Sequence, residues 1–482
     1  MPSDNGINRR RFLGASTGAL GASLSGGVQG ASKAASSRPN VIVFYTDQQR
    51  SDSVGVYGRS PMDLTPNLDQ VARSAVRFEN TFTTQPVCAP ARSTIQTGKY
   101  PTTTGVFHNS LILKDDEQTL AHYFKRAHYQ TGYIGKWHLG GTTKKPVPLE
   151  RRGGYDEWWT ASDVLEFTSG PFEGHMFDAN NRQIDFKKYR VDFLTDLAVD
   201  FIRQKKDNPF FLFLSFLEPH HQNGRNNQDV VDSKLDRFVA PEGYAERYRN
   251  NFHIPPDLAP FPGDWKSSLP NYYGSIARID ECYGRMLKEL ADHNLLDNTI
   301  VVFTSDHGCH FRTRNSEYKR SCHDASIRIP LVIRGPGFDA PRVVPELTSI
   351  VDLPPTLLEA AGIAVPKAMQ GQSLLALAQG RQKNWRNEIM VQMREEALQR
   401  AIRTERWKYC IYNPESKRTE PSSTEYVERY LYDLAADPHE HVNLIGRAAY
   451  REIADDLQQR LIERMTTAGE PRPKVTPAKY YA

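Results

Sequence analysis

The hydrophobic residues of this chain fall into short uninterrupted runs that do not alternate with polar positions. Four runs are rich in β-branched and aromatic residues, at positions 41–45, 210–216, 299–304 and 329–333. Runs of this length and composition are typical of strands that are buried on both faces of a parallel sheet. A weaker strand is predicted at Tyr133-Ile134.

Helical periodicity separates these predicted strands. Apolar residues recur three or four positions apart over 191–202 and again over 276–290. That spacing places an apolar stripe along one face of a helix. Strands that alternate with helices predict an α/β fold, with a mixed, largely parallel sheet flanked by helices.

The pattern changes after about residue 380. The later segments resemble short antiparallel strands and one helix, at 389–393, 401–403, 407–412 and 453–465. We therefore expect a catalytic α/β domain over 38–380 and a smaller C-terminal α+β subdomain over 381–482.

The first 37 residues resemble an export signal. Three consecutive arginines, Arg9 to Arg11, precede Phe12-Leu13 and a weakly apolar stretch rich in Gly, Ala and Ser. A basic region followed by a short apolar region is the layout of a signal peptide, and the Arg-Arg-x-Phe-Leu pattern resembles a twin-arginine signal. The alternative is a basic disordered tail. We predict an exported protein, periplasmic or secreted, and no stable membrane insertion elsewhere.

Charge and cysteine content narrow the classes of function. The 482 residues carry a formal net charge of +4, which is too small for a protein that coats nucleic acid but permits an anionic ligand held locally. Five cysteines are too few for a disulfide scaffold. Cys309 and Cys322 could pair in an oxidising compartment or could both remain buried thiols.

Polar side chains follow the predicted strands. In open α/β sheets, ligands bind beyond the carboxyl ends of the strands. The residues at four such ends are Asp47 and Gln48, Lys136 and His138, His220 and His221, and Asp306 and His307. Each alone is more often a cap, a turn or a structural residue. Together they indicate a metal-assisted hydrolytic site.

The segment from Cys88 to Gly98 predicts a short capped helix. Pro90 suits the first helical position and Gly98 suits the C-terminal cap. Cys88 would then lie at a helix N-terminus, where free amide groups and the helix dipole favour an anion. The alternative is a buried cysteine that precedes an ordinary helix.

These residues resemble the signature of a known family. Cys88-Ala89-Pro90-Ala91-Arg92, followed by Thr97-Gly98, is similar to the highly specific sulfatase motif Cys-x-Pro-x-Arg followed by Thr-Gly. Further family motifs occur in order along the chain: Thr46-Asp47-Gln48, Gly135-Lys136-Trp137-His138, Pro219-His220, Ser305-Asp306-His307-Gly308 and Leu431-Tyr432-Asp433-Leu434. The chain therefore resembles the formylglycine-dependent sulfatases of the alkaline phosphatase superfamily, and among them the bacterial polysaccharide sulfatases. This resemblance implies an alkaline-phosphatase-like fold and hydrolysis of sulfate esters.

The resemblance also implies a modified nucleophile. In this family a maturation enzyme oxidises the signature cysteine, here Cys88, to formylglycine, whose aldehyde hydrates to a diol. One hydroxyl attacks sulfur, and the second allows the sulfated intermediate to collapse and expel sulfate. A plain serine or cysteine would need water to attack the covalent sulfate ester, which is slow.

Residue roles follow from the same resemblance. The implied ligands of a divalent cation, usually calcium, are Asp47, Gln48, modified Cys88, Asp306 and His307. The implied catalytic residues are Cys88, Arg92, Lys136, His138, His220 and Lys319, with His220 the better candidate for the proton donor to the leaving oxygen.

Two positions depart from the family pattern. Gln48 stands where many members have a second aspartate, and His307 stands where many have asparagine. The site then has one negative charge fewer and one nitrogen ligand, so a weaker calcium site and a transition-metal site both remain open.

Four further residues are candidates for the substrate pocket. His221 and His323 flank implied catalytic positions, and Arg312 and Arg314 belong to an arginine-rich run that could bind neighbouring sulfate or carboxylate groups. The alternatives are structural histidines and a solvated loop.

The sequence as a whole predicts a sulfatase that acts on a sulfated carbohydrate. Two alternatives remain. One is a phosphonate monoester or phosphodiester hydrolase of the same fold. The other is a non-catalytic protein that binds sulfated polysaccharides, and the full set of implied catalytic residues argues against it. No pattern indicates the sugar, the sulfate position, exo or endo action, or the oligomeric state.

Overall fold

The computed structural model describes residues 38–223, 236–394 and 397–479, and from Arg38 on the chain forms one compact unit. The predicted export leader, 1–37, lies outside the described residues and stays a prediction. Within the described part of the chain, no helix has the length and apolar character that a membrane span needs.

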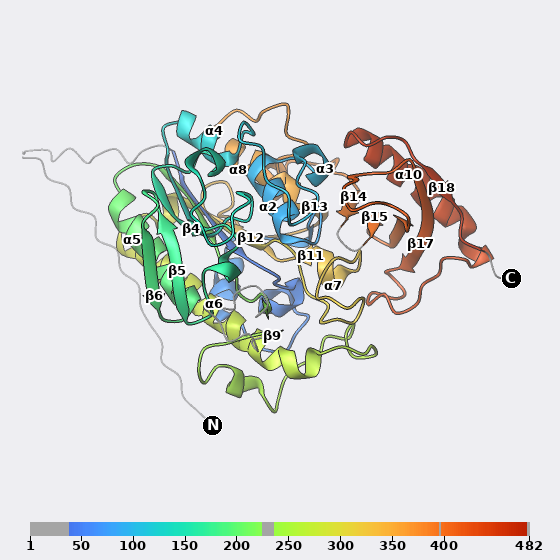
Figure 1. Ribbon diagram of the computed structural model, residues 1–482, viewed down its shortest axis with the longest axis horizontal. Helices are drawn as coiled ribbons and strands as arrows, with labels where there is room; N and C mark the ends of the chain where they lie inside the picture. Colours follow the sequence, from blue (N-terminus) through green and yellow to red (C-terminus); the bar gives the residue numbers. More distant parts are fainter. Residues whose placement is uncertain (1–37, 224–235, 395–396, 480–482) are drawn as a thin grey trace, which may run out of the picture. The chain divides into compact units, whose positions relative to one another are not determined.

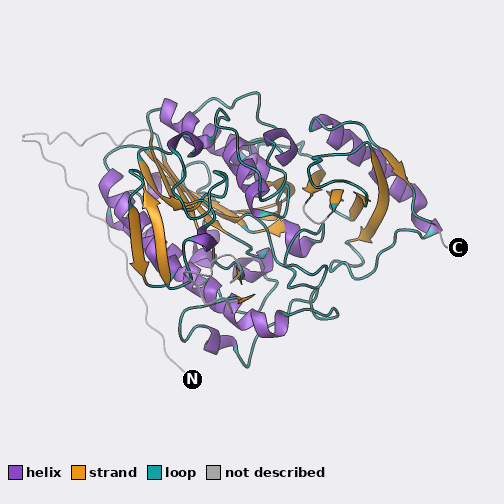
Figure 2. Ribbon diagram, in the orientation of Figure 1, coloured by secondary structure: helices purple, strands orange, loops and turns teal. Residues whose placement is uncertain are grey.

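A mixed sheet of eleven strands forms the larger part of this unit (Figures 1 and 2). Its strands follow the order β11-β2-β12-β10-β1-β7-β3-β4-β5-β6, and β13 also pairs with β2. Their bounds are β1 (Asn40–Thr46), β2 (Val76–Phe82), β3 (Gln130–Lys136), β4 (Trp158–Ser162), β5 (Glu173–Asp178), β6 (Gln183–Lys187), β7 (Phe210–Ser215), β10 (Thr299–Ser305), β11 (Arg328–Ile329), β12 (Leu331–Arg334) and β13 (Arg342–Ser349). A separate short pair joins β8 (Gln222–Asn223) and β9 (Asp236–Arg237).

The centre of the large sheet is parallel, and antiparallel pairs lie toward its edges. Strand β1 pairs in parallel with β10 on one side and with β7 on the other, and β7, β3 and β4 continue in parallel. The pairs of β10 with β12 and of β4 with β5 are antiparallel. The predicted α/β class with a largely parallel sheet is confirmed.

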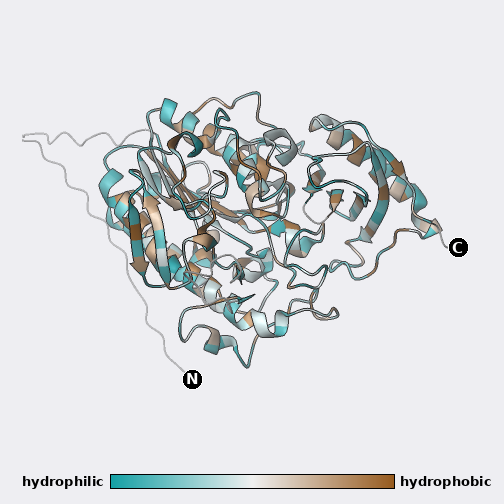
Figure 3. Cartoon of the chain, in the orientation of Figure 1, coloured by the Kyte–Doolittle hydropathy of each residue, from teal (hydrophilic) through white to brown (hydrophobic). Residues whose placement is uncertain are grey.

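Helices cover both faces of this sheet, whose central strands are largely apolar (Figure 3). Val41, Val43 and Tyr45 belong to one core cluster, and Ile42 and Phe44 belong to another. Helices α2 (Cys88–Thr97), α4 (Leu120–Arg126) and α8 (Leu353–Ala360) contribute to the first cluster. Helices α5 (Arg190–Lys205) and α6 (Trp265–Asp292) contribute to the second. The remaining α-helices of this part are short: α1 (Pro66–Ala72), α3 (Pro101–Thr104), α7 (Asp324–Ile327) and α9 (Leu375–Ala378).

One predicted strand is divided in the structure. The run at 329–333 forms the end of β11 and the start of β12, on either side of Pro330. Proline has no backbone N–H to donate, so it interrupts the ladder at that position. Both pieces still pair with β2.

The C-terminal part contains a second sheet, in the order β14-β15-β16-β17-β18. Its strands are β14 (Glu388–Met393), β15 (Leu398–Thr404), β16 (Trp407–Asn413), β17 (Glu425–Asp433) and β18 (Lys474–Thr476), and α10 (Arg451–Thr467) packs against them. The first three strands and the helix match the predicted segments, whereas β17 and β18 were not predicted. The expected α+β subdomain is present, and its proposed boundary at residue 380 stays a prediction.

Candidate active site

Two carboxylates come together at the carboxyl end of the central strands. Thr46 and Ser305 are paired in the parallel ladder of β1 and β10. The next residues along the two strands, Asp47 and Asp306, therefore lie side by side, as the rule for open α/β sheets predicts. Both are completely buried.

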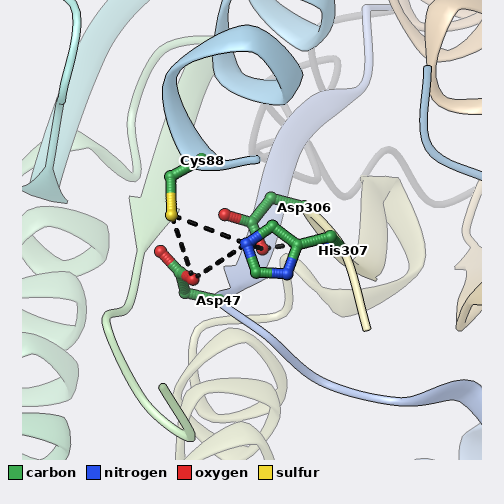
Figure 4. Close-up of side chains that lie close together, drawn as sticks. All are labelled: Asp47, Cys88, Asp306 and His307. Carbon is green, nitrogen blue, oxygen red and sulfur yellow. Dashed lines mark hydrogen bonds and ion pairs between the residues drawn. The ribbon is translucent and has the colours of Figure 1, made fainter. Parts of the chain in front are cut away.

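Cys88 is the first residue of α2 and faces these carboxylates (Figure 4). The helix ends at Gly98 in the left-handed conformation, with φ of 71°, as the sequence predicts. Pro90 is the third helical residue and not the first as expected. Only 1% of Cys88 is exposed.

Four side chains form a cluster that fits a cation. One potential ligand atom from each of Asp47, Cys88, Asp306 and His307 lies within 4.8 Å of all the others (Figure 4). The Cys88 sulfur is 3.5 Å from Asp47 Oδ1 and 3.5 Å from His307 Nε2.

The negative charges of Asp47 and Asp306 are only partly neutralised by nearby cationic side chains. Burial and the neighbouring Asp47 carboxylate raise the pKa of Asp306 to about 7. Asp306 Oδ2 has no hydrogen-bond partner among the described residues and lies 3.6 Å from Arg92 Nη2. Two buried carboxylates and an unpartnered oxygen are what a divalent cation would satisfy.

Gln48 makes hydrogen bonds to the cluster and to residues outside it. Its backbone has φ of 67°, which is uncommon for a residue other than glycine, and its N–H donates to Asp306 Oδ1 at 3.0 Å. Its side-chain oxygen accepts the backbone N–H of His221 at 3.2 Å, and its amide nitrogen lies 3.5 Å from the Cys309 sulfur. Its expected role as a cation ligand stays a prediction.

Arg92 and Lys136 hold the Asp47 carboxylate from two directions. Arg92 Nη2 and Lys136 Nζ each lie 2.9 Å from Asp47 Oδ2. Arg92 also donates to the carbonyl oxygen of Lys136 and to Ser215 Oγ, at 2.9 and 2.6 Å. Burial and the Cys88 sulfur act to raise the pKa of Asp47, but Lys136, His220 and Arg92 outweigh both and lower it.

The Cys88 sulfur is surrounded by cationic groups. Lys319 Nζ is 2.9 Å from it and Lys136 Nζ is 3.7 Å from it. Burial acts to raise the pKa of the thiol, but the positive charges of Lys136 and Lys319 hold it well below its ordinary value. A nucleophile at this position therefore lies where negative charge is stabilised.

His220 and Lys319 form a hydrogen-bonded pair. His220 Nδ1 lies 2.6 Å from the carbonyl oxygen of His221, which can only accept, so Nδ1 carries the proton. Nε2 of the neutral ring is then left to accept from Lys319 Nζ at 3.0 Å. In this arrangement Lys319 holds the proton that the pair shares.

A cleft of about 410 Å³ opens beside the cysteine. Four predicted catalytic residues line it: Cys88, His138, His220 and Lys319. The cleft is also lined by Arg320, the last residue of the predicted arginine-rich run, and by polar residues that the sequence did not single out, among them Asn109, Asp163, Glu166 and Glu317. Glu166 also accepts a hydrogen bond from Lys136 at 3.0 Å. Recognition of β4 as a strand would have directed attention to the residues after its carboxyl end.

The two predicted substrate histidines have structural contacts. His221 is buried and stacks on Tyr318 with ring centroids 4.3 Å apart, and burial lowers its pKa to about 3. His323 is also buried, and its Nε2 lies 3.0 Å from the hydroxyl of Tyr432 in β17. Neither is among the described residues that line the cleft.

The two predicted substrate arginines also pack elsewhere. Arg312 lies over the ring of Tyr318, and its guanidinium is 3.6 Å from both Asp236 and Asp264. Arg314 donates to the carbonyl oxygens of His439 and Glu440, both at 2.9 Å. In the described part of the chain, the structure gives neither residue a place in the cleft wall.

The cysteines are unpaired. All five are buried free thiols among the described residues, so Cys309 and Cys322 do not form a disulfide in this structure. Cys322 packs instead in a cluster with Cys410 of β16 and Phe82 of β2.

The fold and this cluster define a hydrolase of the alkaline-phosphatase-like fold. The chain matches the sulfatase family over residues 39–363 and the C-terminal region of N-sulphoglucosamine sulphohydrolase over residues 316–467. The protein therefore belongs to the sulfatase family and is a sulfuric ester hydrolase, as its signature predicted.

Individual relatives agree with this assignment. The chain is 30% identical over 450 residues to the ulvan-active sulfatase of Formosa agariphila, covering 90% of this chain and 82% of that protein. It is 26% identical over 495 residues to the N-acetylglucosamine-6-O-sulfatase of Bacteroides thetaiotaomicron, covering 88% and 86%. The crystal structure of yidJ, a sulfatase-family protein of Bacteroides fragilis, superposes with a TM-score of 0.77 at 25% identity, covering 90% and 97%. The expected kinship with bacterial polysaccharide sulfatases is confirmed.

Proposed function

We propose that this protein is an exported enzyme that hydrolyses sulfate esters of a sulfated oligo- or polysaccharide, with formylglycine at position 88 and a divalent cation. The observation that carries the proposal is the position of Cys88, which starts α2 beside the cleft with Asp47 and His307 at 3.5 Å and Lys319 at 2.9 Å. The relatives named for ulvan and for N-acetylglucosamine support the carbohydrate class.

The cation would be held by Asp47, Asp306, His307 and residue 88, with Gln48 beside them. The Oδ2 atom of Asp306, which has no hydrogen-bond partner among the described residues, supports this assignment. Calcium is our first choice because the carboxylate oxygens of the cluster fit it. The imidazole of His307 would also suit a transition metal. Such a cation would supply positive charge that acidifies an oxygen nucleophile.

The Cys88 sulfur stands in for the reacting oxygen of formylglycine. Arg92 fixes Asp47 and, through Ser215 and the Lys136 carbonyl, ties the helix to the ends of β7 and β3. Lys136, Lys319 and His138 present cations or hydrogen-bond donors where the sulfate oxygens gain charge in the transition state. The remainder of the substrate would occupy the cleft of about 410 Å³.

The leaving alcohol would take its proton from the pair of His220 and Lys319. Because His220 Nε2 accepts from Lys319, the lysine ammonium can deliver the proton directly or through the imidazole. The sequence indicated His220 as the better candidate for the proton donor, and we assign that role to the pair.

A maturation enzyme is an expected partner. Cys88 is 1% exposed in the folded chain, so such an enzyme must act before this region folds. A twin-arginine signal fits that order, because it exports proteins that are already folded.

The test uses protein in which formylglycine at position 88 has been verified by mass. We expect turnover of at least one member of a panel of oligosaccharides sulfated at defined positions. Nitrophenyl sulfate, phosphate and phosphonate esters are compared in parallel. A clear preference for the phosphorus esters would contradict the proposal and favour the phosphonate or phosphodiester hydrolase. Binding without turnover of any ester would favour the non-catalytic alternative.

A further inference from the structure

Two parts of the cleft wall differ in charge. One part contains Lys319 and His220 together with Arg320, which pairs with Glu317 at 2.8 Å. Another part is the segment that follows β4, from which the lining residues are Asp163, Val164, Glu166 and Phe167. This second part contributes two carboxylates and no cation, so it presents a negative and partly apolar surface to whatever occupies the cleft.

The two acidic residues of that segment differ in their hydrogen bonds. Both oxygens of Asp163 are satisfied, because they accept the backbone N–H groups of Gly140 and Thr142 at 2.8 and 2.7 Å. Glu166 accepts from Lys136 Nζ through Oε1 only, and its Oε2 is buried with no partner among the described residues. Glu166 therefore has capacity for a further donor.

Glu166 carries a negative charge in this position. The residue is 8% exposed, and burial acts to raise its pKa, but Lys136, His220 and His138 outweigh burial and lower it to about 2. Because Lys136 also bonds Asp47 at 2.9 Å, its ammonium is shared between two carboxylates. An ionised oxygen without its own donor is costly inside a protein unless a ligand supplies one.

We propose that Glu166 determines substrate specificity by accepting a hydrogen bond from a hydroxyl or amino group on the carbon next to the scissile sulfate. Glu166 lines the cleft, so a donor on a bound sugar would be the second partner of a carboxylate that now accepts from Lys136 only. A second sulfate or a carboxylate at that position would be repelled by the negative charge of Glu166. The preferred substrates are thus sugars with a free donor beside the sulfate, and vicinally disulfated sugars are disfavoured. This proposal rests on the proposed function as a carbohydrate sulfatase.

The experiment compares two substrates in wild type and in Glu166→Gln. One is the monosulfated sugar that the modified wild-type enzyme cleaves fastest, and the other carries a second sulfate on the adjacent carbon. We expect the wild type to prefer the monosulfated sugar at least about tenfold in kcat/KM, and Glu166→Gln to reduce this ratio at least about fivefold. The glutamine oxygen can still accept from Lys136, so the variant removes the charge and keeps that contact.

Two control variants isolate the charge of Glu166. Glu166→Asp keeps the carboxylate and should retain most of the preference. Glu317→Gln removes another carboxylate of the cleft wall, but one that already pairs with Arg320 at 2.8 Å, so the ratio should not change.

The outcomes separate this proposal from the one on which it rests. Equal loss of activity on both sugars in Glu166→Gln would mean that Glu166 only positions Lys136, and would overturn the specificity role. A wild-type preference for the disulfated sugar would overturn it as well. Absence of turnover on every sulfate ester would overturn the proposed function itself.

Discussion

Lys408 of β16 is expected to stabilise the folded protein more than any exposed lysine does. Its side chain is fully buried, and its ammonium lies 2.5 Å from both Asp324 Oδ1 and Glu440 Oε1. Asp324 begins α7, five residues after Lys319, so this cluster joins the C-terminal sheet to the segment that supplies a cleft cation. The perturbation is Lys408→Met, which keeps the apolar stem and removes the charge.

The magnitude follows from the loss of Lys408 beside two buried carboxylates, of which Glu440 loses the ammonium at 2.5 Å and Asp324 keeps Arg403 at 3.4 Å. Removing one partner of a buried ion pair costs about 3–5 kcal/mol of folding free energy, because the remaining charge stays buried. For roughly 440 residues that unfold together, this corresponds to a midpoint lower by about 3–5 °C. Lys288→Met is a matched control, because Lys288 pairs with Asp292 at 2.5 Å on the exposed surface of α6. The control should change stability by about 0.5 kcal/mol or less.

The effect should also depend on pH. Burial acts to raise the pKa of Asp324, but Lys408, Arg403 and Arg328 outweigh it and hold the pKa well below its ordinary value. The stabilisation from this lowered pKa is therefore complete above the unfolded value near 4 and is lost as the pH falls below it. Burial raises the pKa of Glu440. In Lys408→Met this carboxylate has lost its ammonium and can protonate as the pH falls, so the difference from wild type should be smaller at pH 4 than at pH 7.

Thermal unfolding followed by circular dichroism at pH 7 and pH 4 provides the assay. A Lys408→Met midpoint equal to that of Lys288→Met would refute the reasoning, because the buried pairs would then contribute no more than an exposed one. A higher midpoint than wild type would refute it too.

The remaining predictions concern the site. Cys88→Ala should abolish sulfate ester turnover, by about 10³-fold or more, and leave the thermal midpoint within a few degrees of wild type; retained activity would contradict the formylglycine nucleophile. Chelation of divalent cations should lower activity and the thermal midpoint together, and calcium should restore both, since a ligand bound only by the folded state stabilises it; an unchanged midpoint and rate would count against a cation at Asp47 and Asp306. His221→Phe should change kcat/KM less than about threefold because His221 is a buried, stacked ring, whereas His220→Gln should reduce it at least about 100-fold; comparable losses in the two variants would show that the adjacent histidines are not divided in this way.

Much of the site could be predicted because it depends on local patterns and on one topological rule. The apolar runs identify β1, β7 and β10, and polar residues directly after them meet at the carboxyl ends of parallel strands. Asp47 and Asp306 are positioned in this way, and His220 follows the end of β7 at Ser215 by five residues. The family signature adds Cys88 and Arg92, whose helix the sequence delimits at Gly98.

Other features depend on packing between distant segments, and the sequence alone does not specify it. His323 meets Tyr432, and Arg314 meets the backbone at Glu440, only because the C-terminal sheet packs against the loop after β10. The residues next to them in the sequence do not distinguish such structural residues from ligand-binding ones. Glu166 was missed because β4, a strand of five residues, was not predicted, so the residues after its carboxyl end drew no attention.

The burial of Cys88 also sets a time limit during synthesis. Three of the residues that surround Cys88 are synthesised more than about 200 residues later: Asp306, His307 and Lys319. At a synthesis rate of about 5–20 residues per second, roughly 10–40 s pass before the groups that enclose the cysteine have been made. The long separation between paired strands β1 and β10 would thus give the proposed maturation enzyme an interval in which residue 88 is still accessible. A circular permutant that places the β10 segment ahead of Cys88 would lose that interval, and the yield of modified protein would measure its importance.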